Sequence, residues 1–300
     1  MSRIFVSGLL NIECSVNIGQ FPVEYYPIDY CFFGVNSCVG GVGFNIAKAL
    51  SVLGDEVDLS SIIGGDFEGD RIIQELDKES VGHSLVSREM ESTPASAVLI
   101  DKDGKRRIQC DLKDIQDRRK HLEDGQIPPC HIAVICNINF NREILHQAKA
   151  LNKIIATDVH CLSDIYDEYN REFMENADIL FLSDEALPCE AEEFISQIEN
   201  TCGNPIIVMG RGSKGALMYV KSENKFYNLP AVYNDNVVNT VGAGDALFSA
   251  FIHYYAKGLL PYDALVRAQV FASAKISANG ASKGFITEEE IESRLKALRQ

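Results

Sequence analysis

Short runs of β-branched and other apolar residues alternate with segments of helical periodicity along most of the chain. The sequence opens with a strand-like run at residues 3–8, and a helix closed by Gly54 follows it. A second strand is expected at 56–64 and a second helix at 68–80. Because parallel neighbouring strands need crossover helices, this alternation predicts an α/β fold with a doubly wound, mostly parallel central sheet.

The same alternation continues through the middle of the chain. Further strands are expected at residues 131–138, 153–159, 178–183 and 205–210, with helices between them at 141–151, 169–176 and 190–200. The sequence contains no repeats, low-complexity segments or linkers that would divide it. Residues 1–300 are therefore expected to form a single domain.

Two stretches interrupt the alternation. Residues 12–37 are rich in aromatic residues, Pro and Val, and residues 83–111 contain Asp103-Gly104, a dipeptide that favours hairpin turns. Both stretches follow strands near the N-terminus, so we expect them to pair into one small sheet over a pocket. Two unrelated surface hairpins are the alternative.

The charge of the chain limits the partners that it can bind. It has 28 Lys and Arg against 43 Asp and Glu, a net charge of −15 and a pI near 4.8. This balance argues against binding to a nucleic-acid backbone, whereas one nucleotide needs only a local pocket of N–H groups. No leader is recognised, no apolar run approaches ~20 residues, and the nine cysteines contain no C-x-x-C pair. We expect a cytoplasmic protein with free thiols and no membrane partner.

The motif with the sharpest chemical meaning is NTVGAGDA, at residues 239–246. Gly242, Ala243 and Gly244 precede an apolar helix, so the N–H groups of its first turn and the positive end of its dipole would point at a bound anion. Asp245 lies beside this anion site. It is either a first-turn acid that stabilises the helix dipole, or a general base that deprotonates a hydroxyl during phosphoryl transfer.

A second glycine motif, CVGGVGFNIAKALSVLG, occupies residues 38–54 and carries Asn45 on the first turn of a helix. A dinucleotide-binding loop would directly follow the first strand, but about thirty residues separate that strand from this motif. A nicotinamide-dependent oxidoreductase is therefore disfavoured. The sequence also lacks the GxxxxGK[ST] pattern of Walker-type kinases and the GxSxG pattern of α/β-hydrolases.

In order and spacing, these motifs resemble the ribokinase-like carbohydrate kinases, the PfkB family. The resemblance covers essentially the whole chain, because it includes GLLNIE after the first strand, IGGDFEGD at 63–70, VMGRGSKGALMY at 208–219 and NGASKGF at 279–285. It implies a three-layer α/β/α sandwich with a small β lid, formed by about residues 12–37 and 83–111. It also implies an ATP-dependent kinase that uses Mg²⁺ and acts on a sugar or nucleoside.

The resemblance implies roles for individual residues. Substrate hydroxyls would be contacted by Asn11, Glu13, Gly41 and Asn45. The transferred phosphoryl group would lie on Gly242, Ala243 and Gly244 with Asp245 as the base, and ATP would lie near Gly210, Gly212, Gly215, Thr240 and Asn279. From its position at the end of the second interrupting stretch, Asp111 is a further candidate for a substrate contact, with a solvated surface residue as the alternative.

Three positions depart from the family pattern. Asn239 stands where the family commonly has an acid, so the resemblance does not carry a monovalent-cation site over to this chain. The segment 183–186 lacks the Asn and Glu of the signature associated with magnesium, which leaves Asp184 or Glu185 as the candidate metal ligands. Glu13 replaces the usual Asp and has a longer reach.

The sequence thus predicts phosphoryl transfer from ATP to a primary hydroxyl of a ribose-like sugar or ribonucleoside. A similarity of GGVGFNIA and of residues 136–138 to pseudouridine kinases favours the nucleoside branch of the family. The alternative is a catalytically weak sugar sensor on the same fold, which the altered segment 183–186 supports. Lid hairpins in this family often pair between subunits, so a homodimer through the lid is a further expectation.

Overall fold

A large central sheet organises the molecule, and a computed structural model describes it for residues 1–123 and 126–298. Within these residues the sheet has nine strands in the order β13-β12-β11-β10-β9-β8-β1-β4-β5. The strands are β1 (Arg3–Ser7), β4 (Glu56–Gly64), β5 (Gly82–Met90), β8 (Ile132–Ile135), β9 (Ile154–Cys161), β10 (Ile179–Ser183), β11 (Ile206–Gly210), β12 (Ala216–Val220) and β13 (Lys225–Leu229).

The seven strands from β11 to β5 pair in parallel, as the alternating sequence predicts. Their apolar runs are buried on both faces; Ile4, Phe5 and Val6 of β1, for example, are all 0% exposed. The antiparallel hairpin of β12 and β13, which was not among the predicted strands, extends one edge of the sheet.

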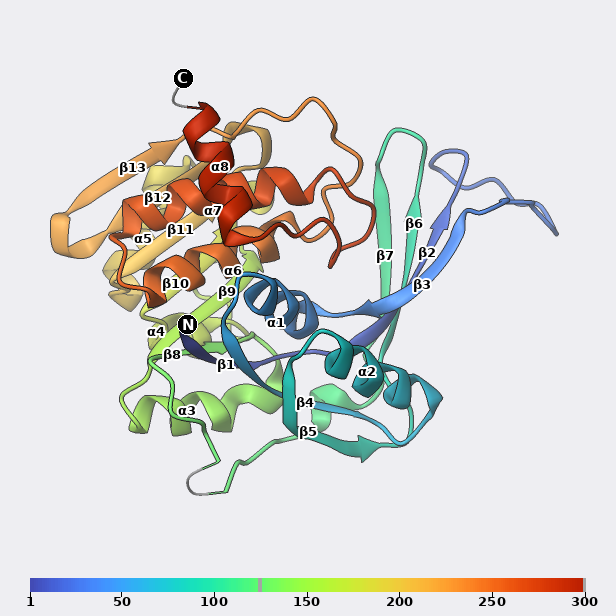
Figure 1. Cartoon of the computed structure of the whole chain (residues 1–300), viewed down its shortest axis with the longest axis horizontal. Helices are drawn as coiled ribbons and strands as arrows, with labels where there is room; N and C mark the ends of the chain where they lie inside the picture. Colours follow the sequence, from blue (N-terminus) through green and yellow to red (C-terminus); the bar gives the residue numbers. More distant parts are fainter. Residues whose placement is uncertain (124–125, 299–300) are drawn as a thin grey trace.

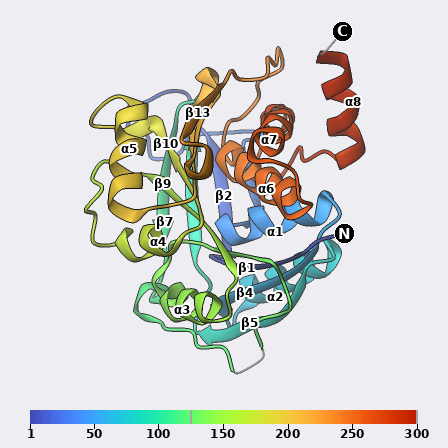
Figure 2. The same ribbon diagram turned by 90° about the vertical axis from the view of Figure 1, so that its left-hand side faces the viewer.

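Helices cover both faces of this sheet and complete a three-layer sandwich (Figures 1 and 2). One face carries α1 (Val42–Val52), α2 (Phe67–Lys78), α6 (Ala243–Ala256), α7 (Pro261–Lys275) and α8 (Glu288–Leu298). The other face carries α3 (Arg142–Ala150), α4 (Arg171–Asn176) and α5 (Ala191–Cys202). Each layer of helices has its own apolar core against the sheet. The predicted fold class is confirmed.

A second, four-stranded sheet lies beside the sandwich in the order β3-β2-β6-β7 (Figure 1). It consists of β2 (Asn11–Asn17), β3 (Val35–Gly40), β6 (Ala95–Ile100) and β7 (Arg106–Asp111). We call this sheet the lid sheet. It joins strands from both of the stretches that interrupt the alternation, and β2 pairs with β6 in parallel.

The expected lid range of 83–111 was too long at its start. Residues 82–90 form β5, which pairs with β4 at the edge of the main sheet. The reason is packing: Leu85 and Val86 lie on opposite faces of the sheet, and each packs against one of the two apolar cores. The chain leaves the main sheet only after β5.

The start of α2 fixes the point at which the chain leaves for the lid sheet. The Asp66 side chain caps α2 by accepting from the Gly69 N–H at 2.9 Å. The same carboxylate accepts from the Thr93 N–H at 2.7 Å and from the Thr93 hydroxyl at 2.6 Å. The segment just before β6 is thereby tied to the sandwich.

Among the described residues, no helix combines the length and the apolar character needed to cross a membrane.

Candidate active site

The first turn of α6 presents free backbone donors. Gly242 caps the helix with φ of +79°, and a side chain there would collide with the Ala281 carbonyl oxygen, so the position requires glycine. In the described structure the N–H groups of Gly242, Gly244 and Asp245 have no acceptor. A Cβ on Gly244 would meet no atom within 4 Å, so the space in front of these donors is open. Such a helix start binds anions.

One of the predicted donors is occupied. The Ala243 N–H donates to the Thr240 carbonyl oxygen at 3.1 Å. This bond forms because the chain turns tightly into the helix, as is common at helix ends. The contact of the Ala243 amide with the phosphoryl group stays a prediction, and the Asp245 amide is a free donor that the motif did not single out.

Asp245 lies half-buried on that first turn, with one carboxylate oxygen fixed and one free. Its Oδ2 accepts from the Asn45 Nδ2 of α1 at 2.7 Å, a contact that joins residues 200 positions apart. Its Oδ1 has no hydrogen-bond partner in the described part of the chain. Burial raises the Asp245 pKa above its usual value, while nearby His160 and the Asn45 hydrogen bond act in the opposite direction.

The lid sheet faces Asp245 with polar side chains. Asn11, Glu13, Ser96 and Cys110 share one face because their strands pair in register and side chains alternate along each strand. The Asn11 Nδ2 donates to the Ser96 hydroxyl at 2.8 Å. Burial raises the Glu13 pKa, and nearby Asp245 raises it as well, whereas positive charges lower it.

Two buried amide oxygens lack donors. Asn11 and Asn45 are both 5% exposed, and the Oδ1 of each has no hydrogen-bond partner in the described structure. An unpaired buried acceptor costs about 1–3 kcal/mol, so native proteins rarely keep one without a reason. Hydroxyl groups of a sugar would satisfy both oxygens. Gly41, the predicted glycine before Asn45, packs against the Leu9 carbonyl and turns the chain into α1.

Asp111 does not belong to this group. It pairs with Ala95, which in turn pairs with Ile12, so its side chain lies on the face of the lid sheet opposite to Glu13. It is exposed and forms an ion pair with Lys113. The expected substrate contact is therefore corrected in favour of a solvated surface residue.

Arg106 is a further candidate site residue, at the start of β7 in the lid sheet. It lies on the Glu13 face of the lid sheet, and its Nη1 donates to the Thr240 hydroxyl at 3.1 Å. The contact joins the lid sheet to the loop before α6. Strand alternation was the available signal, because it places Arg106 and its neighbour Arg107 on opposite faces.

A pocket of about 410 Å³ adjoins the start of α6. It is lined by Gly212, Ser213, Ala231, Val232, Tyr233, Asn234, Val237, Thr240, Ala243, Gln269, Ala272, Ser273 and Ile276. Gln269 is 7% exposed and its Nε2 has no acceptor, so the pocket offers an apolar wall and one buried donor. Such a lining suits a flat heterocycle. Gln269 was not predicted, because a single Gln in a helix carries no sequence signal.

The predicted nucleotide residues divide between this pocket and its surroundings. Gly212 and Thr240 line it. Gly210 ends β11 beside Leu247, and Gly215 forms the following turn. Asn279 does not line the pocket; its Oδ1 accepts from the Asn239 Nδ2 at 2.9 Å.

The candidate metal ligands Asp184 and Glu185 follow β10 at the carboxyl end of the sheet. Asp184 lies 3.9 Å from the Lys214 ammonium, and Glu185 accepts from the Cys161 thiol at 3.5 Å. The described residues contain no cluster of three or more His, Cys, Asp or Glu that could hold a metal. Two adjacent carboxylates suit Mg²⁺, which usually combines one or two protein carboxylates with phosphate and water oxygens.

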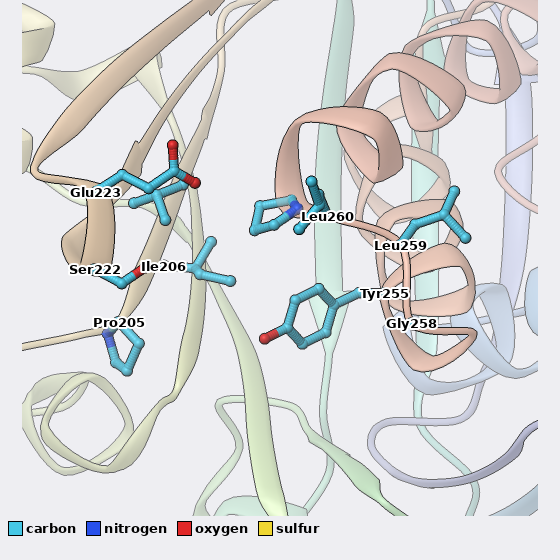
Figure 3. Close-up of a pocket in the computed structure, with 10 residues that line it drawn as sticks. Pro205, Ile206, Ser222, Glu223, Tyr255, Gly258, Leu259 and Leu260 are labelled. Carbon is cyan, nitrogen blue, oxygen red and sulfur yellow. The ribbon is translucent and has the colours of Figure 1, made fainter.

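A further pocket, of about 480 Å³, lies at the other end of the sheet (Figure 3). Its lining includes Ile206, the first residue of β11, together with Tyr255, Leu259 and Leu260 near the turn between α6 and α7. Ligands of open α/β sheets bind outside the carboxyl ends of the strands, and none of the predicted site residues lines this pocket. It is not the candidate active site.

The fold and the site together define a class of protein. An α/β/α sandwich that presents free amides beside a carboxylate, under a sheet of polar side chains, is built as a small-molecule kinase. The family model for pfkB family carbohydrate kinases matches residues 1–288. The chain belongs to the PfkB family and is a carbohydrate or nucleoside kinase.

One relative is similar to this chain in sequence, and two solved structures are similar to it in fold. The chain is 25% identical to the nucleoside kinase of Methanocaldococcus jannaschii over 324 aligned positions, which cover 100% of this chain and 98% of that protein. Its fold matches a microbiome-derived acarbose kinase with a TM-score of 0.89 at 21% identity, covering 98% and 99% of the two chains. It also matches Arabidopsis thaliana ribokinase with a TM-score of 0.83 at 21% identity, over 98% and 99% of the chains.

Proposed function

We propose that the protein transfers the γ-phosphoryl group of ATP to a primary hydroxyl of a ribose-like sugar or ribonucleoside, with Asp245 as the general base. One observation carries the proposal. The Asp245 carboxylate, held by Asn45 at 2.7 Å, lies on the same helix turn as three free amides. A base and an anion site in this arrangement serve the two reacting groups of a phosphoryl transfer.

The chemistry follows from this arrangement. The free Oδ1 of Asp245 accepts the proton of the substrate hydroxyl while the hydroxyl oxygen forms its bond to phosphorus and the bond to the ADP oxygen breaks. The amides of Gly242, Gly244 and Asp245 stabilise the negative charge of the migrating group. These donors need no reorientation during the reaction, because the helix fixes them.

The pocket beside α6 supports ATP as the phosphoryl donor. It extends from Thr240 and Ala243, next to the anion site, to the unpaired Gln269 Nε2. A nucleotide can therefore place its base near Gln269 and its phosphates at the start of α6. Arabidopsis ribokinase, whose fold is similar, has been solved in complex with ribose and ATP. Mg²⁺ bound with ATP would offset phosphate charge, and Asp184 and Glu185 are the residues that would hold it.

The unpaired oxygens of Asn11 and Asn45 support a polyhydroxylated acceptor. Each is a fixed acceptor for a hydroxyl proton, and rejection of analogues that lack the matching hydroxyl is a strong source of specificity. The relative from Methanocaldococcus jannaschii is named a nucleoside kinase. Both observations favour a sugar or a nucleoside whose ribose carries the reacting hydroxyl.

The lid sheet completes the site in this proposal. Arg106 reaches from the lid sheet to Thr240, so closure of the lid places a positive charge beside the anion site and excludes water that would hydrolyse ATP. We further propose that the lid sheet forms a homodimer, because the connection between β2 and β3 exposes several large apolar side chains.

Replacement of the base tests the proposed function. Asp245→Asn keeps the shape and the Asn45 contact but cannot accept a proton, so we expect turnover to fall by about 10²–10⁴-fold. A coupled assay of ADP release over pentoses, hexoses and ribonucleosides measures it. Because the folded-state pKa of Asp245 is raised, its ionisation costs stability at neutral pH, and the variant should melt no lower than the wild type.

Two results would contradict the proposal. Near-normal turnover of Asp245→Asn would remove the base assignment. A sugar-dependent rise of the wild-type melting temperature without any ADP release would instead identify a sugar sensor on a kinase fold.

A further inference from the structure

Lys275 is a fully buried cation that no motif of the sequence explains. It ends α7, and the whole residue is 0% exposed. Lysine is almost never buried in this way unless a partner compensates its charge. Within the described residues, no carboxylate lies within 4.0 Å of its ammonium group. Its compensation must come from neutral oxygens.

Those oxygens belong to the loop that leads into α6. The Lys275 Nζ donates to the carbonyl oxygen of Val241 and contacts that of Asn239 at 3.4 Å. The loop has no acid of its own at this point. The Asn239 side chain is neutral, and it is engaged with Asn279 at 2.9 Å and with the Val241 N–H at 2.8 Å.

The ammonium also acts on the reacting groups. Its charge lowers the pKa of both Asp245 and Glu13, the two carboxylates that face the substrate. Burial lowers the pKa of Lys275 itself to about 8, and the two carboxylates work against that decrease. The Lys275 side chain therefore contacts the loop before α6 and also lowers the pKa of the neighbouring Asp245 carboxylate.

We propose that Lys275 is a positioning residue for phosphoryl transfer, a built-in monovalent cation that holds the carbonyl groups of Asn239 and Val241 and thereby aims the amides of Gly242 and Gly244. The inference rests on the proposed function. Carbonyl oxygens of a protein backbone also bind K⁺ in place of its hydration shell. A lysine ammonium is a compact point charge with three donors, and its covalent tether makes a dissolved ion unnecessary.

A cation series on the wild type and two variants tests this role. The wild type should turn over at the same rate in Na⁺, K⁺, NH₄⁺ or tetramethylammonium. Lys275→Ala should lose at least about tenfold in kcat, since misplacement of reacting groups by ~1 Å can cost about 100-fold. K⁺ or NH₄⁺ should restore much of that loss, and tetramethylammonium, which is too large for the space, should not.

Lys275→Met is the matched control. Its side chain fills the same space without a charge, so its kcat should fall like that of the alanine variant and no cation should restore it. The pattern separates a missing charge from a packing defect, because only the alanine variant can admit an ion. Full kcat for Lys275→Met, or activation of the wild type by K⁺, would overturn the proposal.

A second readout does not depend on turnover. The melting temperature of Lys275→Ala should rise in K⁺ relative to tetramethylammonium, and that of the wild type and of Lys275→Met should not. If the wild type releases no ADP with any sugar or nucleoside, the proposed function fails, but this melting series still decides whether a cation replaces Lys275. Equal melting temperatures of Lys275→Ala in all salts would refute the built-in cation.

Discussion

Asp245 lies among charges that act on it from several elements. Asp158, near the end of β9, opposes its ionisation together with burial. His160 from the same strand, Asn45 from α1 and Lys275 from α7 favour ionisation. The balance raises the pKa of Asp245, which suits a base that must hold a proton briefly during the reaction and release it afterwards.

The raised pKa of Asp245 sets the acid limb of the pH–rate profile. The base works only when ionised, so kcat/KM should fall as the pH drops through an apparent pKa above the usual carboxylate value of 3.8. Steady-state kinetics between pH 4.5 and 8 at saturating ATP measure the limb. Asn45→Ala removes the hydrogen bond that favours ionisation, so its limb should lie at higher pH than that of the wild type. Identical limbs in the two proteins would show that another group is titrating.

At the scale of the element, the two glycines at the start of α6 are required for different reasons. Gly242 has a positive φ and packs against the Ala281 carbonyl. Gly244 lies within the helix and faces open space. Gly242 is needed for the backbone conformation at the start of the helix, and Gly244 leaves the space in front of the free amides open.

Alanine at each position should separate the two roles. Gly242→Ala should destabilise the protein, because it forces a side chain into a left-handed conformation and into a carbonyl oxygen. Gly244→Ala should leave the protein as stable or stabilise it by ~0.5–1 kcal/mol, since alanine is the better helix former. Its methyl group should nevertheless reduce turnover by occupying the space before the amides. Urea denaturation and the ADP-release assay provide the two readouts, and unimpaired turnover of Gly244→Ala would place the phosphoryl group elsewhere.

The sequence predicted the elements of the main sheet more completely than the geometry of the lid. Strands such as β8 and β10 are continuous apolar runs, which indicate burial without knowledge of the partner. The sequence of β5 is largely polar and does not show which sheet the strand joins, so its assignment to the lid was wrong. Asp111 was misjudged for a related reason, because which side of the lid sheet faces the site depends on how β7 pairs with β6.

Single residues were harder to find than motifs. The glycine motifs indicated an anion site and drew attention to the segments that carry Asn45 and Asp245, but only the structure shows that these two side chains are in contact. Lys275 and Gln269 sit in α7 as a lysine near a helix end and a polar residue in an apolar helix, which are ordinary features. Only the tertiary structure shows that both are buried and what they face.

At the scale of the whole molecule, the connection between β2 and β3 projects away from the body (Figure 1). Its large exposed apolar side chains are Val23, Tyr25, Tyr26, Ile28, Tyr30, Phe32 and Phe33. Exposed apolar clusters of this kind usually mark an interface. A dimer through the lid sheet would bury them.

Light scattering tests that dimer. The wild type should have twice the chain mass of 33.2 kDa, and replacing Tyr25 and Phe33 together by Ser should weaken association at micromolar concentration. Tyr166→Ser is the matched control, because Tyr166 is 66% exposed but lies between β9 and α4. A wild type with the mass of one chain, or a control that dissociates equally, would exclude the interface.

The candidate site combines residues from segments that are translated at very different times. Asn11 and Asn45 leave the ribosome early, Asp245 follows some two hundred residues later, and Lys275 is later still. An unfinished chain therefore contains Asn11 and Asn45, which are proposed to contact the sugar. It still lacks Asp245, the proposed base, and the loop before α6 that would hold phosphate. With the proposed roles of these residues, a nascent chain would be unable to hydrolyse ATP before the segment around Asp245 has been translated and folded.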